Sequence, residues 1–280
     1  MPTRLRAPQI HIGTAGWSIP RALADAFPGE GQHLDRYARV LNCAEINTSF
    51  YRPHRTEVYA RWAAQTPAGF RFAAKLPRAI THDARLRAAR VPLQLFIAEV
   101  SGLGDRLAVL LVQLPPSLVF EPRPVRRFFA LLGDLYGGAV ICEPRHASWF
   151  TPAAGRLLAA LRVGRAASDP ALVAEAAVPG GWLGDNGDGA GAVLYHRWHG
   201  SPRMYRSSYG DAWIRQRAIE LRKWPAAADC WAVFDNTAAG AAASNALALK
   251  ALLHSGKGLL PDSGKGTGKG IGKGRGKGSG

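Results

Sequence analysis

The sequence predicts an α/β protein built as a single (β/α)₈ barrel of the TIM type over residues 10–254. Along this range, short runs rich in β-forming residues alternate with segments that carry the apolar spacing of helices. The runs lie about 20 to 40 residues apart, which suits a strand, a crossover helix and the next parallel strand. Eight runs of this kind fit a closed barrel better than an open doubly wound sheet.

The expected strands cover residues 10–13, 43–47, 70–75, 108–114, 138–143, 163–169, 192–199 and 231–236. Helices are expected between them because apolar residues recur there at spacings of three and four. Three segments carry this spacing most plainly: Leu34, Tyr37, Ala38 and Leu41; Val125, Phe128, Phe129 and Leu132; and Ile214, Ala218 and Leu221. Thr151, which precedes Pro152, and Asp211 are typical of helix starts.

Composition limits the class of protein. The chain has 280 residues, of which 47% are hydrophobic, so it can bury a sizeable core and is not disordered throughout. Its 36 Lys and Arg residues outnumber 20 Asp and Glu residues, which gives a net charge of +16. A basic balance favours anionic partners, among them nucleic acid, phosphorylated metabolites and acidic lipid.

The two ends differ from the barrel range. Residues 1–9 form an N-terminal extension, and residues 255–280 form a Gly/Lys-rich tail with six basic residues and one acidic residue. We expect this tail to be disordered, because Leu259, Leu260 and Ile271 are its sizeable apolar groups. A nucleic-acid or polyanion tether is its functional interpretation, and a low-complexity extension of little effect is the alternative.

Cysteine spacing and hydropathy point to a cytoplasmic protein. Cys43, Cys142 and Cys230 lie in or beside apolar runs without the C-x-x-C spacing of a zinc or redox site. We therefore expect buried thiols in a reducing compartment. The N-terminus lacks the apolar stretch of a signal peptide, and no segment reaches the length of a membrane span, so we expect no membrane partner.

Polar side chains end most of the expected strands. Since side chains alternate between the two faces of a strand, the inward residues can be assigned from each run. This phase places the following residues at or near the inner, carboxyl-terminal ends: Glu45, Asn47, Lys75, Gln113, Glu143, Asp169, Arg197, His199 and Asp235. The carboxyl-terminal end of such a barrel is where its chemistry lies, so these residues form the predicted site.

Nine motifs, taken in order, resemble the YecE-like family, domain of unknown function family 72. They are IGTAGW (12–17), EINTSFYRP (45–53), TP-x-x-F-x-F-x-x-K (66–75), ITH (80–82), VQLPP (112–116), EPRHASWF (143–150), Asp169, YHRWHG (195–200) and FDN (234–236). The resemblance covers about residues 10–253 and implies a TIM-type barrel. It implies no activity, because the family is named for its unknown function.

The first hypothesis for function is an enzyme, a hydrolase or lyase, that carries out acid–base or hydrolytic chemistry on a phosphate- or carboxylate-bearing substrate. Glu45 or Glu143 would transfer protons, and His146 and His199 are alternative proton carriers. Lys75, Arg145 and Arg197 would hold the anionic oxygens. The complete substrate-binding prediction is Trp17, Asn47, Lys75, His82, Gln113, Arg145, Trp149, Asp169, Arg197, Asp235 and Asn236.

Two other hypotheses stay open. In the first, a divalent metal cleaves a phosphoester and is held by Glu143, His146, Asp169, His199 and Asp235. In the second, the protein is not an enzyme, and the basic barrel and tail bind RNA or DNA through phosphate contacts and base stacking. We predict no organic cofactor, and a metal belongs to the first of these alternatives alone. The sequence indicates no oligomeric state.

Overall fold

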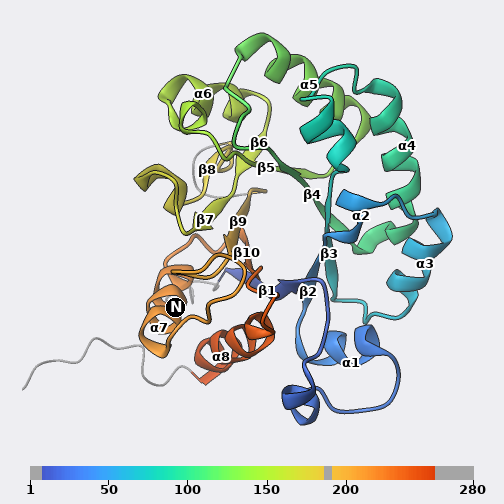
Figure 1. Cartoon of the computed structure of the whole chain (residues 1–280), viewed down its shortest axis with the longest axis vertical. Helices are drawn as coiled ribbons and strands as arrows, with labels where there is room; N and C mark the ends of the chain where they lie inside the picture. Colours follow the sequence, from blue (N-terminus) through green and yellow to red (C-terminus); the bar gives the residue numbers. More distant parts are fainter. Residues whose placement is uncertain (1–7, 186–190, 256–280) are drawn as a thin grey trace, which may run out of the picture.

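The computed structural model describes residues 8–185 and 191–255, and within them the predicted α/β barrel is present. Figure 1 shows the strands at the centre, with helices α1 and α3 to α8 outside them. The predicted disordered tail lies outside the described residues, apart from Ser255 at the end of the last helix, and so do residues 1–7 of the N-terminal extension.

The barrel strands follow the predicted runs closely. They are β1 (Gln9–Ala15), β2 (Cys43–Ile46), β3 (Arg71–Lys75), β4 (Leu107–Gln113), β5 (Ala139–Glu143), β6 (Val163–Arg165), β7 (Ala167–Asp169), β9 (Val193–Trp198) and β10 (Asp229–Phe234), with the two-residue β8 (Gly180–Gly181) at one edge. Neighbours pair in the order β7-β9-β10-β1-β2-β3-β4-β5-β6-β8. All pairs are parallel except β6 with β8.

Helices connect successive strands, as expected for parallel pairing. They are α1 (His33–Val40), α2 (Thr48–Tyr51), α3 (Thr56–Ala64), α4 (Arg90–Val100), α5 (Pro122–Leu135), α6 (Pro152–Ala160), α7 (Asp211–Arg222) and α8 (Ala241–Ser255). Short 3₁₀ turns cover Arg21–Ala26, Ser101–Arg106, Ala147–Phe150 and Ala174–Ala177, and a π-helical turn covers Ala79–Asp83. The predicted cap at Thr151 is present, because its hydroxyl accepts a hydrogen bond from the backbone N–H of Ala154.

The sixth expected strand differs from the prediction. It is divided into β6, which pairs with β5, and β7, which pairs with β9, so the chain at Ala166 closes the ring of strands. The residues of this segment that face the barrel interior are also the alternate set to the one predicted. Ala166 belongs to the inner apolar cluster, and a Cβ on Gly164 would lie 2.6 Å from Cδ1 of Ile141, so small residues face the interior here.

The other strands keep the predicted phase. The barrel interior is filled by Cys43, Ala73, Val109, Leu111, Ile141, Ala166, Tyr195, Trp231 and Val233. A larger apolar layer, which includes Tyr37, Phe72, Phe128 and Trp198, packs between the sheet and the helices. The interior apolar layer lies below the polar strand ends, and so it supports the side chains that gather there.

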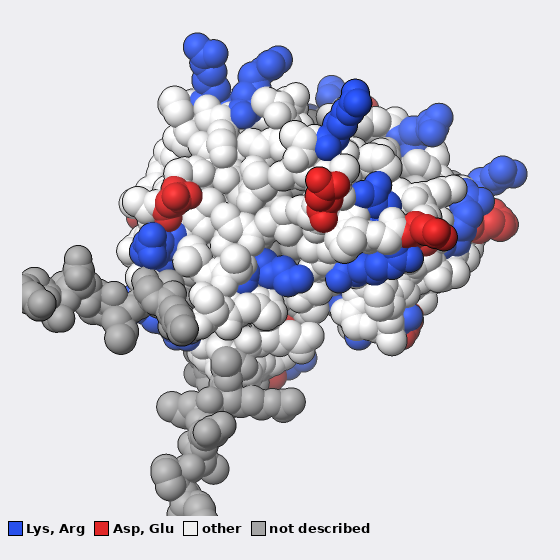
Figure 2. All heavy atoms as spheres, turned by 90° about the horizontal axis from the view of Figure 1, so that it is seen from below, with Lys and Arg blue, Asp and Glu red and all other residues white. Residues whose placement is uncertain are grey.

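The surface agrees with the basic composition. On the face seen in Figure 2, Lys and Arg side chains are spread widely and Asp and Glu side chains are fewer. Within residues 8–185 and 191–255, no helix combines the length and the apolar character needed to cross a bilayer.

Candidate functional site

Arg197, on β9, lies at the centre of a buried ionic network at the carboxyl-terminal mouth of the barrel. Its Nε donates to Oε2 of Glu45 at 2.8 Å, and its Nη2 donates to Oε1 of Glu45 at 2.6 Å. The remaining donors reach Oε2 of Glu143 at 2.5 Å and Oδ2 of Asp235 at 2.8 Å. One guanidinium therefore binds three carboxylates, which come from β2, the end of β5 and the residue after β10.

Glu45 is fully enclosed by this network. Besides the two-point contact with Arg197, its Oε2 accepts a hydrogen bond from the Tyr195 hydroxyl at 3.0 Å, and its side chain is inaccessible to solvent. Burial, followed by the charge of Glu45, raises the pKa of Tyr195 well above its usual value, so this phenol remains a hydrogen-bond donor.

His199 bridges the carboxylates on the other side of Arg197. Its Nδ1 lies 3.0 Å from Oδ2 of Asp235, and its Nε2 lies 3.0 Å from Oε1 of Glu143. Nη2 of Arg145 is a second neighbour of Nε2, at 2.9 Å. Two protonation states fit this geometry: a neutral ring accepts at Nε2 from Arg145, and an imidazolium donates there to Glu143.

Glu143 is ionised in this setting. Its Oε1 lies 2.7 Å from Nη2 of Arg145 and accepts from the Ser168 hydroxyl at 3.2 Å. Burial alone raises the pKa of Glu143, but Arg145, Arg197 and His199 together outweigh it and hold this pKa well below the usual range. Burial likewise raises the pKa of Asp235, and Arg197 and His199 reverse the effect.

Lys75, at the end of β3, is the unpaired cation of the mouth. Its Nζ lies 4.2 Å from the centre of the Phe50 ring, and in the part of the chain that the structure describes it forms no salt bridge or hydrogen bond. Burial and then the nearby charge of Arg197 lower the pKa of Lys75 to about 8, although Glu45, Glu143 and Asp235 act in the opposite direction. This amine therefore titrates close to neutral pH.

The connection between β9 and α7 covers the network. The Tyr205 ring packs edge-on against His199, with the ring centres 5.5 Å apart. Hydrogen bonds from Asn236 hold the same connection. Its Nδ2 donates to the Ser207 carbonyl at 2.9 Å and to Oδ1 of Asn245 at 2.8 Å. Asn236 thus fixes the connection that covers the network, and its own side chain is completely buried.

Seven residues predicted for the site meet in this network, namely Glu45, Lys75, Glu143, Arg145, Arg197, His199 and Asp235. Others lie beside it. Gln113 pairs with Glu143 in the sheet register, and the His82 ring meets the edge of Phe50. Asn47 follows β2, and its Oδ1 is buried without a hydrogen-bond partner among the residues described.

Four predicted site residues make their contacts outside the network, and the inward orientation predicted for Asp169 is corrected. Asp169 points toward the helix layer, where its Oδ1 accepts from the Tyr209 hydroxyl at 2.8 Å, because the phase of β6 and β7 is reversed. Trp149 is wholly buried and donates to the Leu118 carbonyl at 2.8 Å. Trp17 packs against Trp62 of α3, and Nδ1 of His146 caps the following turn at Ser148.

Three participants were not among the predicted site residues. Ser168 was missed because of the reversed phase, and the small residues Gly164 and Ala166 were the signal that could have revealed it. Tyr195 shares the inward face of Arg197, so its phase alone indicated a place beside Glu45. Tyr205 lies in an irregular connection, and no period in the sequence indicates where such a residue goes.

Of the five ligands expected in the metal hypothesis, three meet at the mouth, namely Glu143, His199 and Asp235. His146 and Asp169 face other partners, and the three carboxylates at the mouth are bound by Arg197. Within the described ranges, no group of three or more His, Cys, Asp or Glu side chains has an arrangement suited to a metal ion.

The fold and the site together define a (β/α)₈ barrel with an ionic network buried at its carboxyl-terminal mouth. The chain belongs to the DUF72 family, described as a protein of unknown function, whose family model matches residues 11–266. The family resemblance carried by the motifs is thereby confirmed.

Known relatives agree with this assignment. The chain is 34% identical over 142 residues to the UPF0759 protein YecE of Escherichia coli K12, an alignment that covers 50% of each protein, so it spans about half the length of this relative. A solved DUF72 family protein of Enterococcus faecalis superposes with a TM-score of 0.70 at 18% identity, over 88% of this chain and 96% of that one. A DUF72 family protein of Thermotoga maritima gives a TM-score of 0.69 at 21% identity, over 88% and 99%.

Replacement of Glu143 by Gln should strongly destabilise the fold. The change removes a charge that faces Arg145, Arg197 and His199 and leaves their buried positive charge only partly compensated, so we expect the free energy of unfolding to fall by about 3–5 kcal/mol. Chemical denaturation measures this loss. Glu121→Gln, at an exposed position, is the matched control and should stay within about 0.5 kcal/mol. An equally small effect at Glu143 would contradict the network.

Proposed function

We propose that the protein is an enzyme that carries out acid–base chemistry, of the hydrolase or lyase class, on a small anionic substrate at the mouth of the barrel. The observation that carries this proposal is the placement of His199 between two carboxylates and Arg145. A ring nitrogen that has a proton donor, Arg145, and a proton acceptor, Glu143, both within hydrogen-bond distance is arranged to exchange a proton.

The charge of the network supports an anionic substrate. Glu45, Glu143 and Asp235 oppose Arg145, Arg197 and Lys75, so the two signs balance when His199 is neutral. Lys75 forms no salt bridge with these carboxylates in the described structure, so its charge is available to an anion that arrives beside it.

Each network residue then has a role. Lys75 and Arg145 bind the substrate anion, since Lys75 lacks a partner in the described structure and 15% of the Arg145 side chain is exposed. His199 transfers the proton, and Asp235 orients its ring through Nδ1. Glu45, Glu143 and Arg197 are positioning residues, because their mutual contacts use most of their hydrogen-bonding groups. In this proposal His199 takes the place of Glu45 and Glu143 as the proton carrier.

A screen of phosphoesters, sugar phosphates, carboxylates and nucleic acids tests the proposal. Once turnover of one class is found, His199→Gln should lower kcat by about 10²- to 10⁴-fold, the usual contribution of acid–base catalysis. His54→Gln is the matched control, because that ring contacts Thr48 outside the network. Equal activity in the two variants would exclude His199 as the proton carrier.

Two further measurements distinguish the remaining hypotheses. Activity that disappears with a chelator and returns with Mg²⁺ or Mn²⁺ would favour the metal-dependent phosphoesterase. If turnover is absent and single-stranded DNA binds, with affinity that falls steeply with salt, the protein is a nucleic-acid-binding protein. A chain that ends at residue 255 then shows whether the tail supplies that binding.

Binding of sulfate at the mouth should weaken as the pH rises through about 8. The protonated amine of Lys75 binds the anion, and its pKa is lowered to about 8, so the charged form is present below this pH and is lost above it. Sulfate itself does not titrate here, and its Kd should rise up to about tenfold per pH unit above 8. Calorimetry between pH 6 and 10 measures this.

Two variants make the result specific. Lys75→Met should remove the pH-dependent part of binding, whereas Lys223→Met, which changes an exposed lysine, should preserve it. Lys75→Arg keeps a cation and should move the loss of affinity to higher pH. Sulfate affinity that is unchanged between pH 7 and 9 in the unaltered protein would count against Lys75 as the anion-binding group.

A further inference from the structure

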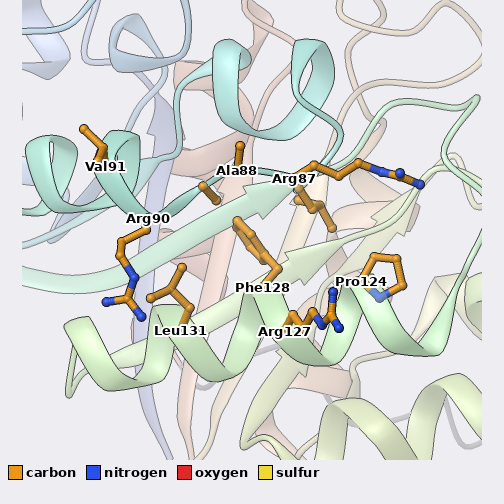
Figure 3. Close-up of a pocket in the computed structure, with 10 residues that line it drawn as sticks. Arg87, Ala88, Arg90, Val91, Pro124, Arg127, Phe128 and Leu131 are labelled. Atoms are coloured by element: carbon orange, nitrogen blue, oxygen red, sulfur yellow. The ribbon is translucent and has the colours of Figure 1, made fainter.

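A second candidate site lies outside the barrel, in a groove between α4 and α5. This pocket has a volume of about 440 Å³, and Figure 3 shows its lining from both elements. The turn before α4 and the start of that helix form one wall, and α5 forms the other. None of its lining residues belongs to the ionic network, so the pocket is distinct from the mouth.

The wall of the pocket is apolar. Phe128, Leu131 and Pro124 of α5 line the pocket together with Ala88 and Val91 (Figure 3). Val91 is 62% exposed, and Leu95, one helical turn further along α4, is exposed to the same degree. Large apolar side chains exposed together at the edge of a pocket favour contact with an apolar ligand.

Three arginines border the same space. Arg87, Arg90 and Arg127 all line the pocket. The Arg87 guanidinium is 4.0 Å from Glu121, and Arg90 and Arg127 take part in no salt bridge within residues 8–185 and 191–255. Two of the three guanidinium groups thus have no acidic partner in the described structure, so the border of the pocket is positively charged and favours an anion.

The turn that carries this wall has a costly backbone conformation. Arg85, Leu86 and Ala88 all adopt positive φ values, of 51°, 66° and 47°, although none is glycine. Arg85 fixes the turn by donating to the Ser117 hydroxyl at 3.0 Å and to the Ser117 carbonyl at 2.9 Å. The turn places Arg87 and Ala88 at the rim of the pocket, so the strained backbone contributes to its shape.

From these observations we propose that the groove between α4 and α5 binds a small amphipathic anion, with an alkyl or aromatic body against Phe128, Leu131 and Val91 and a phosphate or carboxylate group held by the arginines. The volume lies within the range of about 300–1,000 Å³ that is typical of small-molecule pockets. Arginine suits the head group because its planar fork binds two oxygens at once. The proposal does not depend on the function proposed for the mouth.

Calorimetry with octyl phosphate tests this site in the full chain. Octyl phosphate should bind at least tenfold more tightly than inorganic phosphate or 1-octanol, because each of these offers only half of the required chemistry. The double variant Arg90→Gln/Arg127→Gln should raise the Kd for octyl phosphate by about tenfold per arginine. Arg123→Gln/Arg126→Gln, which removes two exposed arginines of α5 that do not line the pocket, is the matched control and should bind normally.

A second variant changes the apolar wall. Val91→Glu adds a carboxylate to the lining at an exposed position, so it should weaken octyl phosphate binding at least tenfold while melting remains close to that of the unaltered protein. If the unaltered protein binds inorganic phosphate as tightly as octyl phosphate, the groove is only an ion-binding patch and the proposal is overturned. Loss of binding in Lys75→Met but not in the arginine double variant would also overturn it, because the ligand would then lie at the mouth. Self-association that Val91→Glu abolishes would instead assign the groove to an interface between two copies.

Discussion

The mouth of this barrel depends on one buried guanidinium. Arg197 binds Glu45 at two points and reaches Glu143 and Asp235 with its other donors, so it links strands on opposite sides of the ring. Three carboxylates this close would repel one another strongly without it, and an unpaired arginine there would be equally unfavourable. The negative carboxylates can therefore be buried only because the positive guanidinium is buried with them, and the reverse also holds. The geometry of the whole site follows from this constraint.

The network divides into an inner and an outer part. Glu45, Tyr195 and Arg197 are completely enclosed, and their contacts fix where the remaining side chains lie. His199, Arg145 and Lys75 lie around this fixed centre, and the Tyr205 ring packs against His199. Buried ion pairs are weak evidence for stability, because well-packed apolar residues of similar volume are often at least as stabilising. A cluster of this size at the carboxyl-terminal mouth is more typical of a functional site.

The sequence predicts this arrangement as far as regular periodicity reaches. Alternation along the strands identifies Glu45, Lys75, Glu143 and Arg197 as inward residues near strand ends, and the barrel brings them together. Periodicity fails at Ala166, where one expected strand becomes two and small residues face the interior. It also cannot place Tyr205, because tertiary contacts determine the path of the connection between β9 and α7. Nor does any sequence pattern show that Arg197 would be bound by carboxylates and thus be unavailable to a substrate.

Arg197 couples carboxylates that come from separate strands. Glu45 and Asp235 both accept from its Nη2, so a double-mutant cycle of Glu45→Gln and Asp235→Asn, measured by chemical denaturation, tests the claim directly. We expect the free energy of unfolding of the double variant to differ from the sum of the single effects by about 0.5–3 kcal/mol, as for residues in one buried network. Effects that add to within about 0.3–0.5 kcal/mol would mean that the two carboxylates act independently, and would contradict a network organised by Arg197.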